Sequence, residues 1–258
     1  MSFILFEKKN GVAFITLNRP EKFNSFCREM AFALLEKLDE AEQSADARCV
    51  YLTGNGKAFC AGQDLAEAID DNGIELLQIV EEHYNPIILK MRNLNKPILC
   101  AVNGVAAGAG ANIALAGDVV VATQSASFIQ AFSKIGLIPD SGGTFFLPRI
   151  IGLQKASALM MLGDKVSAEN AEKMGMIYQY FSDASFVAES TKLAETMATM
   201  PTKGIALTKY LLNQSFQNNL EQQLKLEGEI QVKASQTYDY QEGVRAFLEK
   251  RNPIFKGE

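Results

Sequence analysis

An apolar strand that runs into a glycine- and alanine-rich turn and then into an apolar helix is the feature that most limits how this chain folds. The sequence predicts the strand over Ile98–Val102, the turn over Asn103–Gly110 and the helix over Ala111–Ala116. Small residues at such a turn leave backbone N–H groups uncovered at the start of the helix, where the dipole favours negative charge. The turn is therefore a candidate site for an anion.

A second segment has the same character. Gly56–Leu65 follows another apolar strand, Cys49–Thr53, and again places small residues where a ligand can touch the main chain. Two N–H donors converging on one oxygen would form an oxyanion hole, although glycines at such junctions more often serve turns and packing. The dinucleotide-binding fingerprint is disfavoured because Ile113 occupies its third glycine position, and the sequence contains no Gly-Lys-Ser/Thr phosphate loop.

Strands and helices alternate up to about residue 179, which predicts an α/β core with crossover connections and ligands at the carboxyl ends of the strands. The Asn10-Gly11 step predicts a hairpin turn between the first two strands. The remaining predicted strands are Phe3–Phe6, Val12–Leu17 and Asp118–Ala122, and the remaining predicted helices are Arg28–Gln43 and Asn72–Asn93.

The pattern becomes wholly helical after Gln179. We expect residues 1–195 to form the α/β core that holds the active site, and residues 196–258 to form a helical oligomerisation region. Its apolar stripes must be buried against the core or against a neighbouring subunit, so an oligomer is expected. The predicted helices are Ala184–Thr199, Thr202–Gln217, Leu220–Ser235 and Tyr240–Glu249.

Composition excludes several classes of partner. The net charge of −5 and the isoelectric point near 5.2 give no general attraction for nucleic acids or anionic membranes, so neither is expected as a partner. No apolar stretch reaches membrane-spanning length, and the N-terminal residues lack the pattern of a signal peptide. These features predict a cytoplasmic protein.

The thiols and the single histidine show no catalytic or metal-binding spacing. Cys27, Cys49, Cys60 and Cys100 each occur singly in apolar segments, which is typical of reduced core thiols. His83 stands beside two glutamates and is predicted to lie on a solvated helix face. One histidine cannot support a multi-histidine metal site, and the sequence contains no Gly-x-Ser-x-Gly elbow. We therefore expect no metal and no Ser-His-Asp catalysis.

Four ordered motifs resemble the crotonase (enoyl-CoA hydratase/isomerase) superfamily: Leu17–Phe26, Ala58–Leu65, Lys96–Asn112 and Gly136–Thr144. The resemblance covers essentially the whole chain. It implies an α/β fold of repeated ββα turns wound into a superhelix, with a C-terminal helical region that forms a homotrimer or a dimer of trimers. It also implies acyl-CoA thioester substrates and no separate cofactor, because coenzyme A is part of the substrate. The thioester carbonyl would be held by the backbone N–H groups that match Gln63 and Ala109.

Within this superfamily the acid and base residues decide the reaction. Hydratases carry glutamates at the positions that match Asn112 and Phe132, so the sequence departs from the hydratase pattern at both. The remaining candidate is Asp140, at a position where some members carry a catalytic aspartate. The alternative is that Asp140 or Ser141 only caps a helix. A dehalogenase fits less well, because its histidine position is Asn85 here and the chain has no tryptophan.

The resemblance is closer to family isomerases that act on a ring epoxide of an aryl-acyl-CoA or shift a double bond of an enoyl-CoA. An acyl-CoA isomerase using Asp140 is therefore expected, with a hydratase or a non-catalytic acyl-CoA-binding protein as alternatives. Phe132, helped by Ile138, would exclude water and raise the pKa of Asp140.

By resemblance, the segments around residues 19–24 and 61–65 would hold coenzyme A, and Lys22 or Lys250 would meet phosphate. Ordinary solvated charge is the alternative for both lysines. Asp64 and Asp118 are expected mainly to tie loops. The full set of expected substrate contacts is Lys22, Asn24, Ala61, Asp64, Leu65, Gly108, Gly110, Phe132, Pro139, Gly143 and Lys250.

Overall fold

The N-terminal hairpin forms as the sequence predicts. In the computed structural model, which describes residues 2–68 and 73–258, β1 (Ile4–Lys9) pairs antiparallel with β2 (Val12–Leu17). Asn10 and Gly11 connect them with φ angles of 51° and 77°. Positive φ at both turn residues is what a tight hairpin turn requires, and it explains the Asn-Gly step.

Two sheets make up the core. The larger has the order β1-β2-β3-β5-β7-β10, and the smaller has the order β4-β6-β8-β9. The consecutive pairs β3/β4, β5/β6 and β7/β8 each give one strand to each sheet, so the chain winds as the expected repeated ββα superhelix. Their bounds are β3 (Cys49–Gly54), β4 (Ala58–Cys60), β5 (Ile98–Val102), β6 (Val105–Ala107), β7 (Val119–Thr123), β8 (Ser127–Ile129), β9 (Lys165–Ser167) and β10 (Gln179–Phe181).

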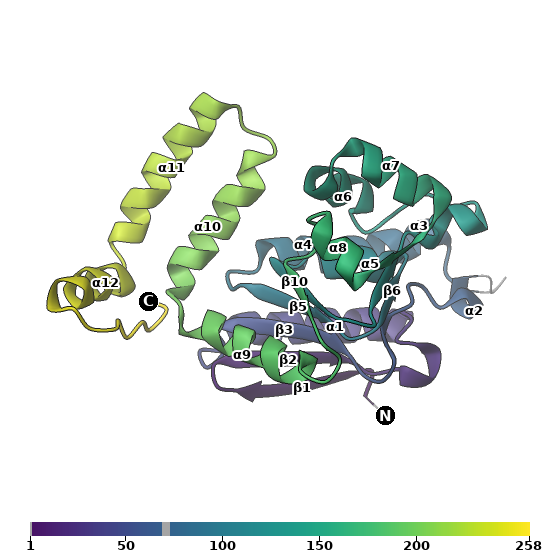
Figure 1. Ribbon diagram of the computed structural model, residues 1–258, viewed down its shortest axis with the longest axis horizontal. Coiled ribbons are helices and arrows are strands. Elements are labelled where there is room, and N and C mark those ends of the chain that lie inside the picture. Colours follow the sequence, from purple (N-terminus) through teal and green to yellow (C-terminus); the bar gives the residue numbers. More distant parts are fainter. Residues whose placement is uncertain (1, 69–72) are drawn as a thin grey trace.

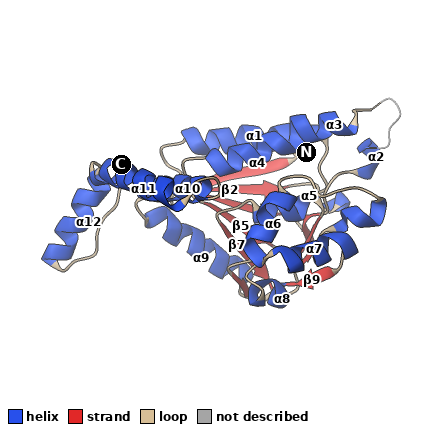
Figure 2. Cartoon of the chain, turned by 90° about the horizontal axis from the view of Figure 1, so that it is seen from above, coloured by secondary structure: helices blue, strands red, loops and turns tan. Residues whose placement is uncertain are grey.

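Helices cover both faces of the larger sheet. Figure 2 shows α1 (Arg28–Gln43) and α4 (Asn85–Asn93) on one face and α9 (Phe186–Thr199) on the other. The central strands β3 and β5 are apolar and buried on both faces, as is usual in parallel sheets. The other helical segments of the core are η1 (Pro20–Lys22), α2 (Leu65–Ala68), α3 (Leu76–Ile79), η2 (Val80–Tyr84), α5 (Ala109–Leu115), η3 (Ala131–Ile135), α6 (Gly143–Ile151), α7 (Leu153–Leu162) and α8 (Ala168–Lys173).

Two predicted helices in the middle of the chain need correction. The helix predicted from residue 111 begins at Ala109, because the preceding turn contains strand β6 and ends at Gly108. The segment predicted as a helix over 72–93 is helical from Leu76 to Asn93, with a π-helical segment, η2, inside it; residue 72 lies outside the described residues.

The prediction for His83 was wrong: the side chain is fully buried, and burial lowers its pKa. The four cysteines are buried free thiols, as expected.

The C-terminal helices α10 (Thr202–Ser215), α11 (Leu220–Ser235) and α12 (Tyr238–Glu249) form an arm that projects from the core (Figure 1). The boundary that we placed at residue 195 falls inside α9, whose Ala194 and Ala198 pack against the larger sheet. The arm therefore leaves the core after α9. None of the helices in the described part of the chain is long and apolar enough to cross a membrane.

A buried ion pair attaches the arm to the core. The Nζ atom of Lys209 lies 2.8 Å from Oδ2 of Asp118 and donates to the carbonyl oxygen of Met91 at 2.7 Å. Asp118 also binds Arg92 at 3.1 Å and accepts the backbone N–H of Ile98 at 2.8 Å, which confirms its role in tying segments together.

Replacing Lys209 with alanine is expected to lower the free energy of unfolding by about 2 kcal/mol, because it removes a buried charged hydrogen-bond donor while Arg92 still compensates Asp118. Urea denaturation followed by circular dichroism measures the change. Lys173→Ala is the matched control, because Lys173 pairs with Glu169 at 2.6 Å on the surface. An exposed pair of this kind should contribute nothing measurable. Equal effects of the two variants would contradict the prediction.

Candidate active site

The parallel strands of the smaller sheet end at one edge, and the candidate residues follow them. Strand β6 pairs with β4 on one side and with β8 on the other. Gly62 and Gln63 follow β4, whereas Gly108 and Ala109 follow β6. A Cβ atom placed on Gly62 would lie 3.0 Å from the carbonyl oxygen of Ala107 and 3.6 Å from the backbone nitrogen of Ala109. The two turns are therefore in contact.

Both turns present a free backbone donor. Within the described residues, the N–H groups of Gln63 and Ala109 donate to no protein acceptor, while the N–H of Asp64 donates to the carbonyl oxygen of Phe26 at 2.8 Å. Ala109 is the first residue of α5 and is only 3% exposed. Two such donors in adjoining turns fit the requirements of an oxyanion hole.

Steric constraints explain why glycines surround these donors. Gly108 has a φ of 54° and a ψ of −129°, a conformation that is open essentially only to glycine. A Cβ atom there would lie 3.8 Å from the Phe132 ring, so this aromatic side chain covers the turn. At Gly110 a Cβ atom would lie 2.4 Å from the carbonyl oxygen of Cys60, which shows how closely α5 packs on β4.

Asp140 does not cap the helix that follows it. Gly142 is the N-cap residue of α6, and no side chain forms a capping hydrogen bond there. The Oδ1 atom of Asp140 instead accepts the hydroxyl of Ser141 at 2.9 Å. Burial raises the pKa of this carboxyl group, and no described cation lies close enough to lower it. The capping alternative for Asp140 and Ser141 is therefore wrong.

Asn112, which the sequence resemblance matches to a hydratase glutamate, holds the Asp140 loop in place. Its Nδ2 atom donates to the carbonyl oxygen of Asp140 at 2.9 Å, and its Oδ1 atom accepts the side-chain amide of Gln130 at 2.8 Å. A Cβ atom on Gly143 would lie 2.4 Å from that same Nδ2, so glycine is needed where α6 meets α5. This polar contact fixes Asp140 relative to the helix that begins at Ala109.

The segments expected to hold coenzyme A are tied together by polar contacts. Arg19 and Asp64 form a 2.9 Å ion pair, and the hydrogen bond from Arg19 lowers the pKa of Asp64. The amide of Asn24 is buried and binds the carbonyl oxygens of Asn55 and Ala58, so this side chain serves the loop. Lys22, Ala61 and Leu65 are exposed beside these loops.

Two expected residues are not where the site needs them. Ile138 is 81% exposed, so within this chain it does not shield Asp140 from water as we expected; Pro139 is half-buried. Lys250 ends α12, and Figure 1 shows this helix at the opposite end of the molecule from α5. Within one chain, Lys250 is therefore not brought together with Gln63, Ala109 and Asp140.

Sequence reasoning missed the side chains that hold Gln63. The hydroxyl of Tyr84 donates to Oε1 of Gln63 at 2.6 Å, and Nε2 of Gln63 donates to Oε2 of Glu67 at 2.6 Å. Glu67 lies only four residues after Gln63, but no local pattern links Gln63 to Tyr84, 21 residues away. The neighbouring Glu81 and Glu82 instead favour an exposed helix face around Tyr84.

Comparison with known proteins gives consistent results over the whole chain. The model of the enoyl-CoA hydratase/isomerase family matches residues 7–258. The chain is 48% identical to the 1,2-epoxyphenylacetyl-CoA isomerase of Escherichia coli (strain K12), covering 100% of both proteins. It is 42% identical to a protein of Rhodobacter capsulatus named "probable enoyl-CoA hydratase", covering 98% of each. A crystal structure of an enoyl-CoA hydratase from Polaromonas sp. JS666 superimposes with a TM-score of 0.91 at 33% identity, covering 98% of this chain and 99% of that one.

Proposed function

The chain belongs to the enoyl-CoA hydratase/isomerase family, and from this membership we propose that it is an acyl-CoA isomerase that moves a proton with Asp140. Its substrates are 1,2-epoxyphenylacetyl-CoA, the substrate named for the relative of Escherichia coli, or a 3-enoyl-CoA, or both. The thioester carbonyl binds between the N–H groups of Gln63 and Ala109.

One observation carries the proposal. Asp140 is a half-buried carboxyl group with a raised pKa, and its backbone is held by Asn112, which occupies a hydratase glutamate position. The other glutamate position is occupied by the buried Phe132. A site with one mobile proton carrier suits an isomerisation, since water addition calls for a group that activates water.

The parts suggest a mechanism for a double-bond shift. Asp140 removes a proton from C2 of a 3-enoyl thioester, and the electrons of the C2–H bond enter a dienolate whose oxygen is stabilised by the two N–H groups. The same carboxyl group then returns the proton to C4, which leaves the double bond between C2 and C3. A raised pKa suits a group that must both accept and release a proton.

A panel of three substrates tests the proposal. Purified protein is incubated separately with a 3-enoyl-CoA, with epoxyphenylacetyl-CoA and with crotonyl-CoA, of which the last tests for the addition of water. The products are separated by liquid chromatography. Conversion of either of the first two supports an isomerase. Hydration of crotonyl-CoA alone would establish a hydratase, and binding without any conversion would establish an acyl-CoA-binding protein.

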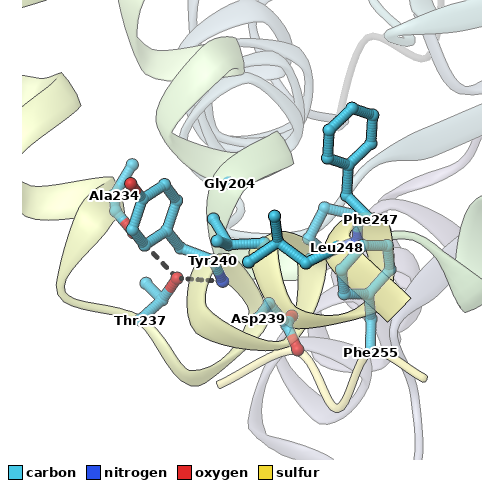
Figure 3. Close-up of a pocket in the computed structure, with 11 residues that line it drawn as sticks. Gly204, Ala234, Thr237, Asp239, Tyr240, Phe247, Leu248 and Phe255 are labelled. Carbon is cyan, nitrogen blue, oxygen red and sulfur yellow. Dashed lines mark hydrogen bonds between the residues drawn. The ribbon is translucent and has the colours of Figure 1, made fainter. Parts of the chain in front are cut away.

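We also propose that the chain assembles as a homotrimer or a dimer of trimers through its arm. Between α10 and α12 lies an apolar hollow of about 460 Å³. Figure 3 shows Tyr240 and Leu248 of α12, and Gly204 of α10, around it. Leu248 and its neighbour Phe247 are 74% and 82% exposed. Adjacent exposed apolar side chains of this kind mark association surfaces.

Leu248→Asp is expected to shift the protein toward monomers, because the new charge would have to be desolvated in the interface. Analytical ultracentrifugation measures the mass of each species. Leu220→Asp is the matched control, since Leu220 is equally exposed at 74% but lies outside the hollow. A wild-type protein that sediments as a monomer would contradict the proposal directly.

A further inference from the structure

We propose that Tyr84 is a positioning residue of the oxyanion hole. By binding the side chain of Gln63, it fixes the position of the backbone N–H of that residue. This inference rests on the proposed function, because it assumes that the N–H groups of Gln63 and Ala109 bind the thioester oxygen. Tyr84 contacts the side chain of Gln63 rather than either donor nitrogen. It fixes the residue that carries one of them.

The side-chain amide of Gln63 is bound at both ends. Tyr84 donates its hydroxyl to Oε1 at 2.6 Å, and Nε2 donates to Glu67 at 2.6 Å. Glu67 is itself anchored, because its Oε1 atom accepts the backbone N–H of Arg28 at 2.9 Å. Gln63 therefore cannot rotate without breaking two short hydrogen bonds, one of them to a carboxylate, and bonds of this type are among the stronger ones.

The ring of Tyr84 supports the same segment. It is only 1% exposed and packs edge-on against the Phe26 ring, with the ring centres 6.0 Å apart. The backbone N–H of Phe26 donates to the carbonyl oxygen of Gly62 at 2.7 Å, and Phe26 forms a β-bridge with Gln63. The ring of Tyr84 thus packs on Phe26, which is hydrogen-bonded to Gly62, while its hydroxyl binds Gln63 directly.

Tyr84 comes from the π-helical segment η2, whose wider turn changes the direction of its side chains relative to a regular α-helix. Such segments occur frequently at functional sites. Burial raises the pKa of Tyr84, so the phenol keeps its proton and remains a donor.

A phenylalanine would fill the same space without the hydrogen bond, so Tyr84→Phe isolates the hydroxyl. We expect kcat to fall by up to about 10²-fold, the effect of a small misplacement of a reacting group, while KM changes little. Tyr51→Phe is the matched control. The Tyr51 hydroxyl is also buried and lies 2.9 Å from Oγ of Ser190, but it packs in the cluster on the α9 face of the sheet. Its kcat should remain that of the wild type.

An infrared measurement detects the hydrogen bonds of the oxyanion hole to a bound carbonyl group and requires no turnover. Butyryl-CoA labelled with ¹³C at the thioester carbonyl is bound to each protein, and the carbonyl stretch is compared with that of free butyryl-CoA. Hydrogen bonds to the carbonyl oxygen lower this frequency. We expect a full lowering in the wild type and in Tyr51→Phe, and a smaller one in Tyr84→Phe.

A double-mutant comparison tests the route through Gln63. If Tyr84 acts only through that side chain, Tyr84→Phe combined with Gln63→Leu is no slower than Gln63→Leu alone. Additive losses would overturn the proposed route, and a wild-type stretch with wild-type kcat in Tyr84→Phe would overturn the positioning role. A wild type that shifts the carbonyl stretch but isomerises no substrate would refute the proposed function while leaving the role of Tyr84 measurable. No lowering in the wild type would overturn the inference together with the oxyanion hole.

Discussion

Replacing Asp140 with asparagine is expected to lower isomerase turnover by roughly 10²- to 10⁴-fold, the usual contribution of a general acid–base group. Asparagine keeps the shape of the side chain and an oxygen for the Ser141 hydroxyl, which binds Oδ1 at 2.9 Å. Acyl-CoA binding, measured by calorimetry, should therefore stay near that of the wild type. The melting temperature should not fall, because a carboxyl group whose pKa is raised by burial is less stable ionised in the fold than in water.

The pH dependence of the wild type provides an independent check. Asp140 must be ionised to accept a proton, so kcat/KM should fall as the pH drops through its raised pKa, above the ordinary aspartate value of about 3.9. Wild-type turnover in Asp140→Asn would end the one-carboxylate mechanism. The nearest alternatives, Asp64 and Glu67, are already bound to Arg19 and to the amide of Gln63.

Ala109→Pro is expected to lower turnover by on the order of 10²- to 10³-fold, because it deletes one of the two oxyanion donors. From the sequence, a proline here is expected to distort the start of the helix as well. The structure corrects that expectation: Ala109 is the first residue of α5, the position where helices accept proline most readily. Stopped-flow kinetics on a 3-enoyl-CoA measure the loss of turnover. Circular dichroism confirms that the variant is folded, so the loss can be assigned to the missing donor.

Two companion variants keep the N–H groups. Ala109→Gly should retain most of the wild-type rate, and Gln63→Ala should lose clearly less than Ala109→Pro because its backbone donor remains. Equal losses in Gln63→Ala and Ala109→Pro that exceed the loss in Tyr84→Phe, with all three proteins folded, would show that the Gln63 side chain binds the carbonyl itself. Near-wild-type activity in Ala109→Pro would exclude this residue as a donor.

Where local pattern determines structure, sequence predicts it closely. The bounds of α1, β5 and α11 agree with prediction because each segment has a clear apolar pattern or a defined end, such as the Asn219 capping box of α11. Lys209 shows the limit, since it is buried only because Asp118 and backbone carbonyl oxygens of the core meet it.

In the candidate site, too, the sequence predicts the parts that depend on local pattern and misses those that depend on long-range contacts. The glycine-rich turns at Gly62 and Gly108 could be found from the sequence because the backbone itself requires those residues. The contact between Tyr84 and Gln63 could not, because it joins residues 21 positions apart and the glutamates beside Tyr84 favour an exposed helix face. His83 stands beside the same glutamates and is nevertheless fully buried.

The contact between Asn112 and the Asp140 carbonyl has an evolutionary consequence. A glutamate at residue 112 would restore half of the hydratase pair, but it would replace the amide donor with a second acceptor facing that carbonyl oxygen. It would also add bulk where α5 and α6 leave no room for a Cβ atom on Gly143. The first step toward water addition would thus damage the proposed isomerase activity before the second glutamate could supply a new one. Epistasis of this kind makes hydratase activity hard to introduce one substitution at a time.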